Sequence, residues 1–452
     1  MEHHPVRLSA GTARCVPLQL ARPIPGSALL FSLVTLVAGC GSRGSPPLEL
    51  IVWSSSENRS VIERQVTEFS RRHAPIRVEV TVLPSAESCR DEFDRRCSQG
   101  KAPDICMIAS HDLPGWIEKA YLQDLGAHLT DERQFLSQVL GSFRSHERLY
   151  AIPCGWSVPA LYYNHALFER HGVPVPNGHW EWSDLLAAAD SLMVEDPDSG
   201  KVVQHGLDLG LSVTLWAPLV WQNHGQLMDT NGTWTLTSPQ YLQSNAEAIE
   251  FYADLVREYQ VAPPPTVTPT HFVRSSRFRE GRAAMTIADR SLAGELAGRA
   301  TFRWDVAPLP RGRTSATSLS TYGYAITSQS ARSAEAWKLI SFLTSETAQT
   351  ALLMRGEFIP SLQQLLVSKT FLDFPGGEPI QNKVFAQSLP VSRALPWTTA
   401  WPVAEAVLTE EMRNLMTNPR ISGRTALGQM QARLDELLLM SRLRDQEPLR
   451  TK

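Results

Sequence analysis

The chain has 452 residues, of which 43% are hydrophobic and 20% are charged. This length and composition predict a globular protein that is large enough for two domains. The formal net charge of −3 provides no basic field, so the composition does not support nucleic-acid binding. The chain contains 12 tryptophans and 9 tyrosines, and we expect most of these rings in the core because large aromatic side chains are usually well buried.

An apolar run near the N-terminus, Ala28–Ala38, follows several arginines and is too short to span a bilayer comfortably as a permanent helix. This pattern predicts an export signal over residues 1–39. The run ends in Val-Ala-Gly-Cys, which resembles the bacterial lipobox, and Cys40 would then become the lipid-anchored N-terminus. Residues 40–47 are rich in Gly, Ser and Pro and are expected to form a tether. The alternative is an ordinary signal peptide with a coincidental cysteine.

The first folded segment is typical of a βαβ unit. A buried strand is expected over residues 48–53, an amphipathic helix over 58–73 and an alternating strand over 76–82. The turn between the first strand and the helix lies at the carboxyl edge of the sheet, where open α/β folds bind their ligands. Capping of the helix is the alternative role of its polar side chains. The candidate ligand contacts in this turn are Ser54, Ser55 and Glu57.

A second group of polar residues comes where another predicted strand ends. A helix is expected over residues 86–99, and the next strand follows Pro103 and Asp104. Hydroxyl and carboxylate groups at this edge can exchange hydrogen bonds with ligand hydroxyls. Ser110 and Asp112 are therefore candidate contacts, whereas His111 is interpreted as a surface histidine.

Four further cysteines follow the tether, and their spacing shows no C-x-x-C metal or redox pattern. Cys89 and Cys97 lie on the same predicted helix, about 12 Å apart along its axis, which excludes a disulfide bond between them while the helix is intact. We therefore predict free thiols at Cys89, Cys97, Cys106 and Cys154.

The stretch Leu149–Asn164 is apolar, β-branched and aromatic, yet it contains Pro153 and Pro159. Because proline lacks the N–H that a central strand donates, this stretch fits an edge or a connection between two bodies. A crossing strand cannot be fully covered by either body, so its side chains border the space between them. Trp156 and Ser157 are accordingly predicted to face an interlobe cleft.

The segment "YAIPCGWSVPALYYNHALFERHGV" followed by "WEWSDLLAAADSLM" resembles the first hinge segment of extracellular solute-binding proteins of ABC importers, of the carbohydrate-binding, maltose-binding-protein-like type. Four further segments resemble motifs of that family in the family's order: "GKAPDI", "WQNHGQLMDTNGTW", "FREGRAAMTIA" and "GEFIP". One departure is His224, where a glycine is common in the family. Another is Asp289–Ser291, where the family often has an aromatic residue.

The resemblance covers the chain from residue 48 to residue 439. It implies an α/β, two-lobed periplasmic-binding-protein type II fold, in which the lobes are discontinuous and are joined by crossing hinge strands. The first lobe is expected over residues 48–150 and 306–347, and the second over 151–305 and 348–452.

The resemblance also implies a function, that of a substrate-binding lipoprotein of an ABC transporter. It would capture a sugar or oligosaccharide by closing its lobes and would deliver it to a permease with its ATPase. We expect an exported monomer that is anchored to a bacterial membrane. No cofactor, metal or nucleic acid is expected to take part. A phosphorylated glycerol or a polyamine is an alternative ligand. Further ligand contacts are expected at Trp221, Asp289, Arg290, Tyr322, Trp397 and Trp401, among which the tryptophans are candidate stacking rings.

An enzyme is the main rival class. None of the G-x-S-x-G, H-E-x-x-H, Walker or G-x-G-x-x-G signatures appears in its required context, and nothing singles out the carboxylate pair that a glycoside hydrolase needs. We therefore predict a protein without enzymatic activity. A lipid-anchored carbohydrate-active enzyme and a ligand-sensing module on the same fold are the alternatives.

Overall fold

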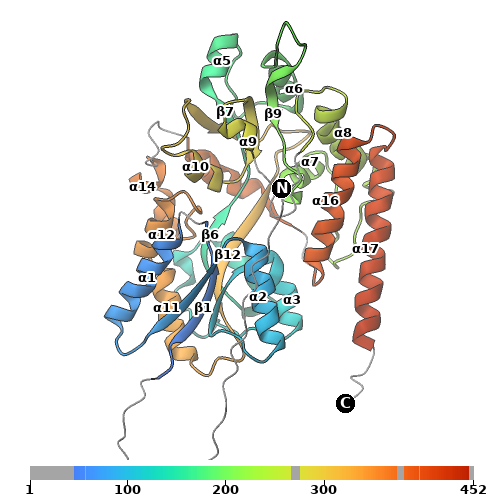
Figure 1. The fold of residues 1–452 in the computed structure, drawn as a ribbon. Coiled ribbons are helices and arrows are strands. Elements are labelled where there is room, and N and C mark those ends of the chain that lie inside the picture. The colour runs from blue at the N-terminus through green and yellow to red at the C-terminus, as the bar shows by residue number, and fades with distance from the viewer. Residues whose placement is uncertain (1–44, 56–57, 266–274, 374–380, 396–397, 447–452) are drawn as a thin grey trace, which may run out of the picture. The chain divides into compact units, whose positions relative to one another are not determined.

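The structure is a computed structural model and describes residues 45–55, 58–265, 275–373, 381–395 and 398–446 (Figure 1). These residues belong to one compact unit. The predicted export signal lies outside them, together with these predicted functional residues: Cys40, Glu57 and Trp397.

The first sheet contains six strands in the order β13-β12-β3-β1-β2, with β6 also paired to β12. β1 is parallel to both β2 and β3, whereas β12 is antiparallel to β3 and β6. The predicted βαβ unit is therefore confirmed, because a helix connects the parallel strands β1 and β2. The strands are β1 (Leu48–Trp53), β2 (Val78–Leu83), β3 (Ile105–Ala109), β6 (Ile152–Ser157), β12 (Thr317–Ile326) and β13 (Ser392–Ala394).

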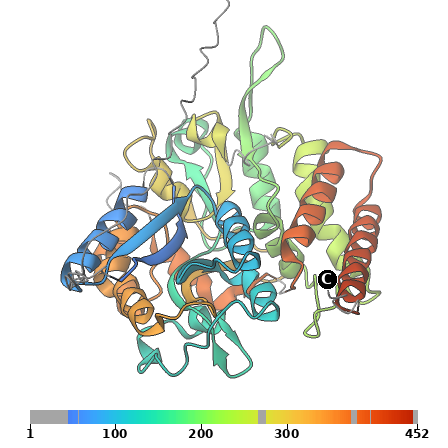
Figure 2. The same ribbon diagram turned by 60° about the horizontal axis from the view of Figure 1, so that its bottom comes forward.

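Helices cover both faces of this sheet (Figures 1 and 2). On one face Phe69 packs edge-on against Phe342, and on the other Phe93 lies 4.1 Å from the ring centre of Trp116. Burial of such rings stabilises the packing of helices on the sheet, because truncating one to alanine typically costs about 3–5 kcal/mol. The first face carries α1 (Arg59–Arg72), α11 (Ser333–Leu343) and α12 (Glu346–Leu353), and the second carries α2 (Ala86–Ser98) and α3 (Leu113–Glu118).

The second sheet contains five strands in the order β11-β7-β10-β9-β8. Its strands are β7 (Ala160–Asn164), β8 (Val194–Glu195), β9 (Val202–Asp208), β10 (Ala283–Ala288) and β11 (Trp304–Ala307). The helices of this part are α5 (His165–His171), α6 (Trp182–Ser191), α7 (Val213–Gln222), α8 (Leu242–Arg257), α9 (Ser276–Arg279), α10 (Ser291–Leu296), α16 (Trp401–Thr417) and α17 (Gly423–Gln446).

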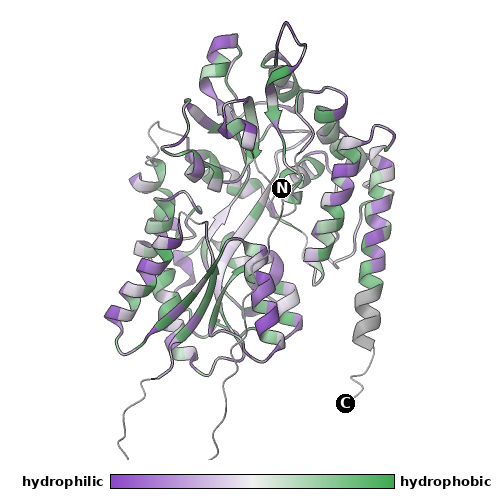
Figure 3. Ribbon diagram, viewed as in Figure 1, coloured by the Kyte–Doolittle hydropathy of each residue, from purple (hydrophilic) through white to green (hydrophobic). Residues whose placement is uncertain are grey.

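Short elements complete the described chain. Figure 3 shows β1 as mostly hydrophobic and β12 in paler colours, whereas α2 mixes hydrophobic and hydrophilic residues along its length. The short strands are β4 (Arg144–Ser145) and β5 (Arg148–Leu149), and the short helices are α4 (Ser137–Gly141), α13 (Gln363–Leu366), α14 (Lys369–Leu372) and α15 (Lys383–Ser388), with 3₁₀ turns at Ser110–Asp112, Glu132–Gln134 and Leu389–Val391.

The chain changes sheet inside the proline-containing stretch that was predicted to cross. β6 belongs to the first sheet and β7 to the second, and only Val158 and Pro159 separate them. The chain returns between β11 in the second sheet and β12 in the first. A hydrophobic cluster at these crossings contains residues of both sheets, such as Trp156 of β6 and Tyr162 of β7. The lobe boundaries implied by the resemblance stay a prediction.

Two further observations concern the described part of the chain. Cys89, Cys97, Cys106 and Cys154 are buried and form no disulfide bond, which confirms the prediction of free thiols. No helix among the described residues combines the length and the apolar character that a membrane crossing requires.

Candidate ligand-binding cleft

The carboxyl ends of β1 and β3 place their polar residues at one edge of the first sheet. The two strands are parallel neighbours, so the residues that follow Trp53 and Ala109 emerge at the same edge. Ser54 and Ser110 are buried there, and Ser55 is exposed. The structure therefore brings together the polar residues predicted from two separate turns.

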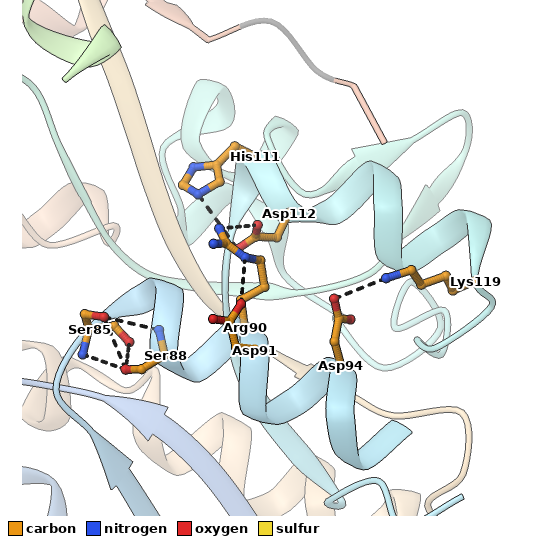
Figure 4. Close-up of polar contacts among 8 residues, drawn as sticks. All are labelled: Ser85, Ser88, Arg90, Asp91, Asp94, His111, Asp112 and Lys119. Atoms are coloured by element: carbon orange, nitrogen blue, oxygen red, sulfur yellow. Dashed lines mark hydrogen bonds and ion pairs between the residues drawn. The ribbon is translucent and has the colours of Figure 1, made fainter. Parts of the chain in front are cut away.

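Asp112 lies close to the side chains of Arg90 and His111 at this edge (Figure 4). Its Oδ1 lies 3.4 Å from an Nη1 of Arg90 on α2, and its Oδ2 lies 3.7 Å from Nε2 of His111. Burial raises the pKa of the Asp112 carboxyl, and the charges of His111 and Arg90 oppose this effect. The Asp112 carboxyl is thus buried and oriented by these contacts, and their charges offset only part of the cost of its burial.

The start of α16 closes over this edge. The rings of His111 and Trp401 lie 6.2 Å apart, and the carbonyl oxygen of Thr399 would be 3.0 Å from a Cβ on Gly115 of α3. Trp401 was predicted as a stacking ring, but its side chain is almost fully buried in the core of the second sheet. Its ring is therefore not free to stack on a ligand.

Trp156 does not face a cleft, contrary to the prediction. Its side chain is fully buried, its indole N–H donates to the carbonyl of Pro360 at 2.9 Å, and its backbone pairs with Ile359. The prediction failed because a segment about 200 residues away in sequence covers the crossing strand, and the sequence gives no sign of that pairing. Ser157, the next residue, points to the opposite face, where its Oγ accepts from the backbone N–H of Arg290 at 3.0 Å.

Asp289 and Arg290 follow β10 and lie against the crossing strands. The hydroxyl of Tyr162 donates to the carbonyl of Asp289 at 2.8 Å. The Arg290 side chain is fully buried, with its guanidinium 5.7 Å from the ring centre of Phe385. Burial lowers the pKa of Arg290 to about 10. Arg290 therefore serves first as an internal charge at the hinge.

An aromatic group lies beside the polar edge. Tyr322 of β12 is half-buried, and its ring centre is 5.7 Å from that of Trp53 and 4.6 Å from that of Phe358. Aromatic faces match the apolar C–H faces of sugar rings. Sequence reasoning found Tyr322 but missed Trp53 and Phe358. The only available signal was that Trp53 directly precedes Ser54.

Trp221 lines a separate cavity of about 240 Å³ at the end of α7. Residues 226–230 of the neighbouring hairpin and Arg393 of β13 complete its walls. The Arg393 guanidinium lies 5.9 Å from the ring centre of Trp221. Arg393 was not predicted, because β13 and α7 are about 170 residues apart in sequence.

A larger cavity, of about 600 Å³, separates the turn after β1 from the α9–α10 region. Ser55 and Asn58 line one side, Ser291 and Glu295 line the other, and residues 354–357 form a third wall. The carboxylate of Glu357 in this third wall accepts a hydrogen bond from Ser54 Oγ at 3.4 Å. The cavity therefore continues the polar edge of the first sheet toward the second.

This architecture defines a class of protein. Two α/β sheets joined by crossing strands, with polar loops and cavities between them, are typical of a two-lobed binding protein that closes on its ligand. Residues 53–350 match the model of the family described as bacterial extracellular solute-binding proteins, and the chain belongs to this family. The predicted family and the predicted two-lobed α/β fold are thereby confirmed.

Individual relatives agree with this assignment. A Brucella abortus (strain 2308) protein that is named as a binding protein is 22% identical over 334 residues, which cover 69% of this chain and 79% of the relative. An ABC substrate-binding protein of Listeria monocytogenes, solved with cycloalternan, has a TM-score of 0.76 at 20% identity over 87% of this chain and 98% of that one. A maltose-bound protein of T. maritima has a TM-score of 0.73 at 19% identity over 86% and 99% of the two chains.

Proposed function

We propose that this solute-binding protein serves an ABC importer and captures a sugar or oligosaccharide between its lobes for delivery to a permease and its ATPase. The observation that carries the proposal is the meeting of a polar edge with an aromatic group. Ser54 and Ser110 lie at the same sheet edge as Trp53 and Tyr322. A sugar presents hydroxyls around its rim and C–H bonds on its face, and it needs both kinds of partner. The maltose-bound T. maritima protein supports the same ligand class.

The proposed ligand contacts are the predicted residues that lie near the cleft in the structure. Ser54, Ser55, Ser110 and Asp112 would bind hydroxyls, and Tyr322 would contact a sugar face. The proposal retains Glu57 and Trp397, which lie outside the described residues, and Trp221 for a longer oligosaccharide. Four further predicted residues would lie at the rim of the site or would position the side chains that contact the ligand: Ser157, Asp289, Arg290 and Trp401.

Lobe closure would couple binding to transport. Contacts from both lobes form only when the lobes approach, so a ligand that makes them shifts the population toward the closed form. The permease would then distinguish the closed shape from the open one. The crossings between β6 and β7 and between β11 and β12 would supply the hinge. In this proposal α12, which contacts α1 and α11, and β13, which pairs with β12, go with the first lobe instead of the second.

The proposal includes a lipid anchor at Cys40, on the lipobox-like sequence alone, which would hold the protein at a bacterial membrane. It also includes the absence of enzymatic turnover. The relatives compared above are described as binding proteins, and no carboxylate pair was singled out for hydrolysis.

Titration of intrinsic tryptophan fluorescence against a panel of monosaccharides and oligosaccharides tests this function. We expect saturable binding of at least one member, with a smaller radius of gyration by X-ray scattering on saturation. A panel that produces neither response would contradict the proposal. Sustained hydrolysis of a glycoside that is abolished by changing one cleft carboxylate would favour an enzyme instead.

A further inference from the structure

The 600 Å³ cavity differs chemically from the aromatic part of the cleft. Among the described residues that line it, none is aromatic. The charged residues among the described lining are two glutamates and three arginines, so this described part of the wall carries an excess of one positive charge in a chain whose formal net charge is −3. The charged residues are Glu295, Glu357, Arg279, Arg299 and Arg355.

Most of these charges have partners inside the protein. Arg279 Nη1 lies 2.7 Å from Glu295 Oε2. Glu357 accepts from Ser54 Oγ at 3.4 Å and from the backbone N–H of Ser55 at 3.5 Å. Arg355 is exposed, and within the described chain its guanidinium has no hydrogen-bond or ion-pair partner. Arg355 is thus a cation at the cavity wall that is available to a ligand.

The lining is matched to an oxyanion. A guanidinium presents a planar fork of N–H donors that fits a carboxylate or phosphate group, and charge-assisted hydrogen bonds are stronger than neutral ones. Asn58 and Ser291 line the same cavity and add neutral donors. A neutral sugar ring would find no aromatic face among these residues.

We infer that the ligand is an acidic carbohydrate, whose carboxylate or phosphate group occupies this cavity against Arg355 while its sugar rings lie toward Tyr322 and Trp53. This inference rests on the proposed function for the sugar part of the ligand. It adds the ligand's charge and the residue that selects for it.

The test uses matched ligands and matched variants of the purified protein. Calorimetry would compare glucose with glucuronate and glucose 6-phosphate, and galactose with galacturonate, so that carboxylate and phosphate are distinguished. We expect an acidic member to bind at least about tenfold more tightly than its neutral partner, with a preference that shrinks as salt is added. Arg355→Gln should abolish that preference and change neutral-sugar affinity less than about twofold. Arg148→Gln, which removes an exposed arginine from β5, should change neither affinity.

The binding data distinguish an acidic ligand from a neutral one. Equal binding of neutral and acidic sugars, or an acidic preference that survives Arg355→Gln, would overturn it while the proposed sugar-binding function stands. If no sugar binds, the melting temperature in inorganic phosphate decides: stabilisation that Arg355→Gln removes would support the anion site and reject the sugar ligand. No stabilisation by phosphate in that case would reject both.

Discussion

Gly294 of α10 and Gly356, which follows α12, meet so closely that a Cβ on Gly356 would lie 2.5 Å from the Cα of Gly294. α10 follows a strand of the second sheet directly, whereas α12 contacts α1 and α11 on the first. Only glycine allows backbones to approach at this distance. The contact is therefore a point at which the two lobes touch without intervening side chains.

Gly356→Ala is expected to hold the lobes apart. The added Cβ would collide with Gly294, so the closed form should lose population, ligand affinity should fall at least about tenfold, and scattering should show less compaction. Gly100→Ala is the matched control, since Gly100 has a φ of +68° against +71° at Gly356 and open space around its Cβ position. Both variants should lose about 1 kcal/mol of stability from left-handed backbone strain. Equal affinity in the two variants would contradict the role of the contact in closure.

Asp112→Asn should stabilise the protein at pH 7 while weakening sugar binding. Burial raises the pKa of Asp112 above its ordinary 3.8, so the folded state binds the proton more tightly than the unfolded state does. The contribution of this carboxyl to stability is then fully present below pH 3.8 and is lost as the pH rises through the folded pKa. The gain in melting temperature of the variant should accordingly shrink as the pH is lowered toward 4. A variant that is less stable than the wild type at pH 7, with a deficit that closes at low pH, would reverse the assigned sign.

Tyr322→Ala and Trp156→Ala should separate binding from folding. The half-buried Tyr322 is expected to contact a sugar face, and its loss should weaken affinity by about 1–3 kcal/mol, on the scale of aromatic stacking on a nucleic-acid base. Trp156 lies in the hinge core, and its truncation should cost about 3–5 kcal/mol of unfolding free energy. Chemical denaturation and ligand titration measure the two quantities. A Tyr322→Ala variant that binds sugar normally would move the proposed aromatic contact elsewhere.

Cys40→Ser should release the protein from the membrane. The variant lacks the thiol that a lipoprotein anchor requires, so expression in a bacterial host should yield protein without palmitate label and without membrane association. A variant that remains labelled and membrane-bound would exclude Cys40 as the anchor, and an unlabelled wild type would favour an ordinary signal peptide.

The sequence alone was sufficient for the βαβ unit and for the position of its ligand edge. Period-2 and period-3.6 hydrophobicity are local properties, and they located β1, α1 and β2 to within about two residues. Once β1 and β3 were recognised as strands of an open α/β sheet, Ser54 and Ser110 could be assigned to its carboxyl edge without coordinates. The crossing at Pro159 was visible for a similar local reason, because proline is unfavourable inside a sheet.

Only the tertiary structure decided which side chains are available to a ligand. Trp156 and Trp401 are as aromatic as Tyr322, but residues remote in sequence cover the two tryptophans and leave Tyr322 half-buried. The meeting of Gly294 with Gly356, and the cavity that Arg355 shares with Ser55, likewise join segments that are far apart along the chain. Hydrophobic patterning specifies that a residue is buried, but its partner depends on how whole elements pack, and that packing is a property of the folded chain.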